Sequence, residues 1–219
     1  MDVLPITMKI SNAIDYSELW ELFLSTGNEE VFSVIYKHNY DILYCVGLKY
    51  TSDIQAIEDS IQNVFIYLLK SRSKLKQVMN LKAYLVKSFR NQLFHDLKKQ
   101  KRLSFPDQLP ENGFDYFNST EESILEKEEL NELQSALRNS IVKLSPKQQE
   151  MIYLRFDCDL SYEQISGILD ISVESCYKSV YRSIKAVKTG IDQMLEKSND
   201  LILFYIYRIK KILQLPTQV

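Results

Sequence analysis

The side chains of this sequence that could do chemistry are basic and aromatic, and they suit binding better than catalysis. Between residues 173 and 188, four basic residues stand against one acidic residue. Lys and Arg bind phosphate oxygens and guanine, while Ser and Tyr bind phosphates or base edges. A helix over this stretch would turn six residues outward, five of them of these types: Glu174, Ser175, Tyr177, Lys178, Tyr181 and Arg182. The pattern predicts a surface that reads duplex DNA.

A second basic cluster lies between residues 80 and 102, where seven basic residues stand against the single acid Asp96. The aromatic residues Tyr84, Phe89 and Phe94 are interleaved with them. Basic side chains neutralise phosphates, and aromatic faces stack on unpaired bases. A solvated helix with buried rings would account for Phe89, but it leaves the charge imbalance unexplained. We therefore expect contact with nucleic acid here as well.

Catalytic and metal sites are not indicated. Cys45, Cys158 and Cys176 are odd in number and far apart, which fits neither a disulfide framework nor a zinc site, and their apolar surroundings predict core packing. His38 and His95 are the only histidines, and no glycine-rich phosphate loop is present. The sequence predicts no enzyme, no cofactor and no metal.

Composition favours a helical protein with local binding patches. The 219 residues are 45% hydrophobic and 26% charged, with only 5 Gly and 5 Pro. The net charge of −2 gives no global attraction to nucleic acid, so DNA binding must come from local patches or from a partner. The start lacks a signal peptide, which predicts a cytoplasmic location. The apolar run 201–207 is too short to span a membrane and predicts docking onto protein.

Helix-start signals position the first basic cluster. Ser145 and Ser161 each have a glutamine three residues later, which is the pattern of a capping box, and Ser172 offers a third N-cap. Apolar spacing between 165 and 184 predicts two short helices with a tight turn before Ser172. This is the pattern of a helix-turn-helix, whose second helix enters the major groove, although such a pair can also be purely structural. Five residues of the second helix are predicted to pack inward: Val173, Cys176, Val180, Ile184 and Val187.

Apolar periodicity predicts further helices over 14–23, 30–50 and 80–102. It also predicts a helix that residues 51–53 open, third in chain order, and one that starts at 121. In the third of these the predicted core face comprises Ile54, Ile57, Ile61, Val64, Phe65 and Leu68. The opposite face carries Glu58, Asp59, Gln62, Asn63, Ile66 and Tyr67. A solvated face would explain most of these residues, whereas Ile66 and Tyr67 favour a partner surface.

An acidic stretch separates the two basic clusters. Residues 103–132 hold nine acidic residues and one basic residue, and the Pro, Gly and Asn content of 103–120 predicts a linker. We therefore predict an all-α fold with two helical domains, 14–102 and 121–195, joined by an acidic linker. A hydrophobic extension, 196–219, completes the chain.

Four patches, in this order, resemble the extracytoplasmic-function (ECF) sigma factors of bacterial RNA polymerase. Residues 32–40 resemble the family's opening helix, and 57–68 its acidic-D-x-x-Q-x-x-F segment. Residues 81–97 resemble its promoter-melting helix, and 144–185 its helix-turn-helix. Asp170 replaces the family's usual turn Gly, and Tyr177 replaces its usual basic residue. The hydrophobic extension is similar to that of ferric-citrate-type relatives in Bacteroidota.

The resemblance implies partners for each surface. Asp59, Gln62, Asn63 and Ile66 would contact the clamp helices of the RNA polymerase core. Bases flipped from the minus-10 promoter element would meet Asn80, Lys87, Arg90, Asn91 and Phe94. The minus-35 element would be read by Ser175, Tyr177, Lys178, Tyr181 and Arg182. The acidic linker would follow the RNA path of the polymerase, and an anti-sigma factor would be a further partner.

Two other functions stay open at the level of the sequence. One is a stand-alone helix-turn-helix regulator with a helical dimerisation or sensing domain, and the other is an all-helical adaptor without DNA contact. The 59–66 face and the basic patch 82–102 discriminate between them and a sigma factor. A simple repressor needs neither feature, and an adaptor needs no basic second helix.

Overall fold

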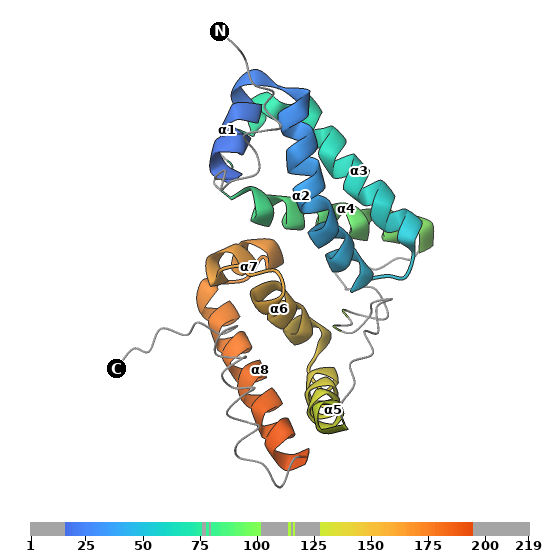
Figure 1. The fold of residues 1–219 in the computed structure, drawn as a ribbon, viewed down its shortest axis with the longest axis vertical. Helices are drawn as coiled ribbons and strands as arrows, with labels where there is room; N and C mark the ends of the chain where they lie inside the picture. Colours follow the sequence, from blue (N-terminus) through green and yellow to red (C-terminus); the bar gives the residue numbers. More distant parts are fainter. Residues whose placement is uncertain are drawn as a thin grey trace, which may run out of the picture. The chain divides into compact units, whose positions relative to one another are not determined.

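The computed structural model describes residues 16–75, 78, 80–101, 114, 116 and 128–194. Every regular element among these residues is helical, which confirms the all-α prediction. The chain divides into two compact units, 1–104 and 105–219 (Figure 1). None of the described helices combines the length and the apolar run that crossing a membrane requires.

The first unit contains α1 (Tyr16–Thr26), α2 (Glu29–Leu48), α3 (Ile54–Ser71), a short 3₁₀ turn η2 (Arg72–Lys74) and α4 (Leu81–Lys101). Asn28 caps α2 by accepting hydrogen bonds from the backbone of Glu30 and Val31. Asp53 caps α3, accepting from the amide of Ala56 at 3.0 Å. Helix α4 matches the helix predicted over 80–102 to within one residue at each end.

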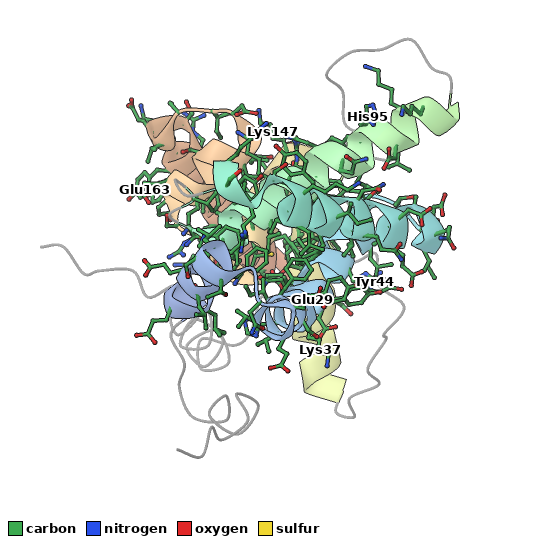
Figure 2. The ribbon with its side chains drawn as sticks, turned by 90° about the horizontal axis from the view of Figure 1, so that it is seen from above. Glu29, Lys37, Tyr44, His95, Lys147 and Glu163 are labelled. Atoms are coloured by element: carbon green, nitrogen blue, oxygen red, sulfur yellow. The ribbon has the colours of Figure 1, made fainter. Side chains whose placement is uncertain are left out.

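The core of the first unit forms where α2, α3 and α4 meet (Figure 1). Gly47 of α2 lies at this point: an added Cβ would be 2.7 Å from Ile57 of α3 and 3.0 Å from Phe89 of α4. Both neighbours are fully buried. Trp20 and Phe23 of α1 are also buried. Charged side chains such as Lys37 project from the outer side of α2 (Figure 2).

The second unit contains α5 (Glu128–Val142), α6 (Pro146–Phe156), α7 (Tyr162–Leu169) and α8 (Val173–Met194). Both predicted capping boxes are present, at Ser145 and at Ser161. Ser172 caps α8, since its hydroxyl accepts a hydrogen bond from the amide of Ser175 at 3.1 Å. Asp170 ends α7 in the left-handed conformation, with φ of 51°. Helices α7 and α8 therefore form the predicted helix-turn-helix.

Three residues predicted to be buried are exposed. Ile54 and Val173 are the first residues of α3 and α8, and burial begins two and three residues later, at Ala56 and Cys176. The apolar pattern of each helix thus begins before the part that neighbouring helices cover. Cys45 is exposed because it lies about 200° around α2 from the buried Leu43.

Two residues of the predicted linker are packed against α6. The Phe114 side chain is only 2% exposed, and its ring centroid lies 5.5 Å from that of Tyr153. Tyr116 donates a 2.7 Å hydrogen bond to Asp157, and its amide donates to Gln149. Burial, and then the Asp157 carboxylate, raise the pKa of the Tyr116 phenol. The composition of the predicted linker gave no indication that these two positions pack against α6.

The rest of the predicted linker within 103–120, the segment 121–127 and the predicted extension at 196–219 lie outside the described residues.

Substituting Gly47 with Ala should destabilise the first unit by about 1–3 kcal/mol, because a methyl group overpacks the contact with Ile57 and Phe89. Trp20 is the only tryptophan of the sequence and is buried in this unit. Its fluorescence during urea denaturation therefore reports on this unit.

Gly167 provides the matched control, because an added Cβ there would meet nothing within 4 Å. Gly167→Ala should leave the Trp20 transition unchanged and stabilise α7 by about 0.5–1 kcal/mol, measured by circular dichroism. If wild type and Gly47→Ala unfolded at the same urea concentration, as followed by Trp20 fluorescence, Gly47 would not be a packing constraint.

Candidate protein and nucleic-acid interfaces

The outer face of α3 is exposed and partly apolar. At about 100° per residue, Asp59, Gln62, Asn63 and Ile66 fall within about 100° of one another on the helix. All four are exposed, and the Ile66 side chain is 45% exposed. Tyr67 and Leu69 add further exposed apolar area beside them. The predicted partner surface is therefore a continuous face of one helix.

One polar contact organises this face. The Gln55 side-chain amide donates a 2.9 Å hydrogen bond to the carboxylate of Asp59, one turn later in α3. The opposite side of α3 is held in the core by Ile57, Ile61 and Leu68, all fully buried. The exposed side chains thus stand on a rigid helix, which suits a preformed protein-binding surface.

The five nucleic-acid residues predicted on α4 also share one face. Asn80, Lys87, Arg90, Asn91 and Phe94 fall within about 100° around the helix axis. Asn80 and Asn91 are exposed, and the other three are half-buried. The buried residues Leu85, Val86, Phe89, Leu93 and Leu97 occupy the other side. The interpretation of Phe89 as a core residue is confirmed.

Phe94 lies between a tyrosine and an arginine. Its ring makes an edge-to-face contact with Tyr50, with centroids 4.9 Å apart. The Arg90 guanidinium carbon lies 4.6 Å from the Phe94 centroid, which is the geometry of a cation–π contact. These contacts hold both side chains in place. They bring a positive charge and an aromatic ring together on the outer face of α4.

Asn80 has a structural role that the sequence did not indicate. Its side-chain oxygen accepts a 2.8 Å hydrogen bond from the amide of Ala83, which makes Asn80 the N-cap of α4. The Asn80 carbonyl also accepts the first helical bond, from Tyr84. Any contact of Asn80 with DNA would have to coexist with this cap.

Asp96, the single acid of the basic helix, ties α4 to α3. Its carboxylate accepts hydrogen bonds from Gln92 at 2.8 Å and from Ser60 of α3 at 3.3 Å. Its other oxygen lies 3.2 Å from Nδ1 of His95. Asp96 therefore fixes the basic helix, which explains why an acid occurs within the basic cluster.

The outer face of α8 carries the third predicted set. Ser175, Tyr177, Lys178, Tyr181 and Arg182 fall within about 160° around the helix and are all exposed. The inward side is filled by fully buried residues, Cys176, Val180 and Ser183. Burial raises the pKa of the Cys176 thiol to about 11, so this cysteine stays protonated and packs as a core residue.

Several of these side chains already have partners on the protein surface. Lys178 forms an ion pair with Glu174, one turn before it. The hydroxyl groups of Ser172 and Ser175 are hydrogen-bonded at 2.8 Å. The ring of Tyr177 contacts Tyr162 of α7 edge-on, with centroids 5.3 Å apart. The helix-turn-helix is thus internally braced where it begins.

The structure has a shallow basic groove between α5 and α8 that the sequence analysis did not predict. Lys143, Arg182 and Lys185 line it, together with the polar residues Thr189 and Gln193. The helical repeat places Lys185 near Arg182 on α8, so this pair could be expected from the sequence. Lys143 comes directly after α5 and reaches the groove only because α5 packs against α8. These side chains suit contact with phosphates.

Metal binding has no support among the residues that the structure describes, where no group of three or more His, Cys, Asp and Glu side chains could hold an ion.

Two family models match the chain, one in each unit. The model described as Sigma-70 region 2 matches residues 35–103, and Sigma-70, region 4 matches residues 134–187. Together they cover more than half of the 219 residues. The first match contains α3 and α4, and the second contains the helix-turn-helix. No curated protein sequence matches the chain.

Two solved structures match the chain. The sigma factor RpoE, in complex with the anti-sigma factor NepR from Bartonella quintana, is 19% identical over 77% of this chain and 98% of its own, with a TM-score of 0.47. A chain of the RsbN–BldN complex is 18% identical over 78% of this chain and 97% of its own, with a TM-score of 0.33.

Replacing Asn80 with Ala should lower the stability of the first unit by about 1 kcal/mol, because the amide of Ala83 loses its side-chain acceptor. Asn80→Ser, which can still cap, should retain most of the stability. Urea denaturation followed by Trp20 fluorescence measures both effects. If the two variants were equally stable, the cap would not be what Asn80 contributes.

Proposed function

This chain belongs to the sigma-70 family, whose members direct bacterial RNA polymerase to promoters, and we propose that it is an ECF-type sigma factor. The observation that carries the proposal is the order of the two family matches. The region 2 match comes first and the region 4 match second, and each lies within one helical unit that has an exposed candidate binding face. The chain acts by binding and has no catalytic chemistry of its own.

The α3 face is the proposed contact with the polymerase core. Asp59, Gln62 and Asn63 would supply hydrogen bonds around the apolar centre formed by Ile66. Protein interfaces combine an apolar centre with a polar rim, and here both occur on one helix. This face lies on α3 while the basic residues lie on α4, so one unit can hold protein and DNA at once.

The α4 face is the proposed contact with the minus-10 element. Lys87 and Arg90 would neutralise phosphates, and the Phe94 ring would support an unstacked base. Asn91, exposed one position after Arg90, offers both a donor and an acceptor to a base edge. Asn80 would contribute mainly by capping the helix that carries these residues.

The α8 face is the proposed contact with the minus-35 element. Ser175, Tyr177 and Lys178 lie in its first two turns, where a recognition helix touches base edges. Tyr181 and Arg182 lie one turn further on. Because Arg182 also lines the groove with Lys143 and Lys185, we assign it to the DNA backbone.

We further propose a cytoplasmic location, the RNA polymerase core and promoter DNA as partners, and control by an anti-sigma factor. These assignments follow from the family resemblance of the sequence. Membership of the ferric-citrate-like branch is proposed from the apolar run at 201–207 alone.

Purified protein added to bacterial core polymerase should start transcription at a subset of promoters. Run-off transcription on a genomic template set, with mapped start sites, tests this expectation. Core polymerase without the protein is the control. If the added protein yielded no promoter-dependent transcripts, the proposed function would be wrong.

Ile66→Ala should weaken binding to core polymerase by roughly fivefold, or about 1 kcal/mol, because it removes the apolar centre of the α3 face. Titration of fluorescently labelled protein with core polymerase measures the affinity. Ile54→Ala is the matched control, since Ile54 is on the same helix, is 47% exposed and lies about 120° away around the axis.

The two isoleucine variants separate an interface from a general surface effect. Unchanged affinity of Ile54→Ala is expected. Equal losses in the two variants would remove the α3 face as the assigned interface.

A further inference from the structure

We propose that Val173, with Tyr177 one turn later, forms an apolar contact for the 5-methyl group of a thymine in the minus-35 element. The inference rests on the proposed function and adds a base-reading residue to it. Val173 was predicted to be buried, and its side chain is instead 42% exposed at the first position of α8.

Exposed apolar side chains form a line along α8. Val173, Tyr177 and Tyr181 are four residues apart, so they lie on successive turns. Tyr177 and Tyr181 are 49% and 60% exposed. A line of exposed apolar residues on a surface helix marks a candidate interaction site. In a recognition helix, such a site faces the floor of the major groove.

Val173 is placed where base edges are read. A recognition helix reaches the bases with its N-terminal residues, and Val173 is the first residue of α8 after the Ser172 cap. The cap fixes the direction in which the helix starts. The contact between Tyr177 and Tyr162 then holds the second apolar side chain against α7.

The polar neighbours are engaged with one another. Ser175 is hydrogen-bonded to Ser172, and Lys178 is paired with Glu174. These groups can exchange their partners for DNA, but each exchange first breaks an existing contact. Val173 has no such contact to break. Among base edges, only thymine offers the major groove a methyl group, so an exposed valine at this position selects thymine.

The test replaces single thymines by deoxyuridine, which lacks only the 5-methyl group. Holoenzyme reconstituted from core polymerase and the full chain is titrated with labelled promoter duplexes, and fluorescence anisotropy gives the affinity. Each thymine of the mapped minus-35 element, on either strand, is replaced in turn. Burial of one methyl group predicts a loss of about fourfold at one position.

Val173→Ala should remove that sensitivity: its affinity should be lower at the natural duplex and change by less than about twofold on deoxyuridine substitution. Val142→Ala is the matched control, with a valine that is 57% exposed at the end of α5. The neighbouring Ser140 contacts Gly190, about 25 Å along α8 from Val173. Val142→Ala should keep the wild-type sensitivity.

Two results would overturn the inference: no position sensitive to deoxyuridine in the wild type, or the same loss in Val173→Ala as in the wild type. A minus-35 element without an A·T pair would count as the first of these. Failure of the proposed function looks different, because the holoenzyme would then select no promoter at all.

Discussion

The close approach of three helices at Gly47 is the constraint on which the first unit depends. Only a glycine leaves room for Ile57 of α3 and Phe89 of α4 beside α2. Once Phe89 is fixed there, the helical repeat turns Lys87, Asn91 and Phe94 outward from α4. Fixing Ile57 turns Asp59 and Ile66 outward from α3 in the same way. Core packing therefore sets the direction of both proposed binding faces, and contacts such as that between Arg90 and Phe94 then hold individual side chains.

The second unit orients its binding helix by local backbone contacts. Ser161 and Ser172 begin α7 and α8, and Asp170 turns the chain between them in the left-handed conformation. Aspartate tolerates this conformation better than most residues, so the turn forms without the glycine that is usual in the family. The Ser172 cap defines where α8 starts, so it makes Val173 the first residue of the helix. At this position the Val173 side chain is exposed, although the sequence predicted that it packs inward.

Local patterns were predictable from the sequence, and positions that depend on neighbouring elements were not. The capping boxes at Ser145 and Ser161 involve residues three apart, so the sequence alone specifies them. The exposure of Val173 depends on how far α7 extends along α8, and the burial of Phe114 depends on α6. The sequence also could not separate a capping role of Asn80 from a role in DNA binding, because Asn suits both.

Charge and recognition are carried by different side chains of α8. The ion pair between Glu174 and Lys178 is exposed, so it is worth only about 0.5 kcal/mol and a phosphate can replace it. Phosphate contacts add affinity at any sequence, and with a net charge of −2 the chain gains little from them alone. Selection among promoters must then come from groups that touch base edges. At the start of α8 the exposed groups without an ionic partner include Val173 and Tyr177. Under the proposed function, shape and methyl contacts of these two residues would choose the site, and the basic groove and the polymerase would supply affinity.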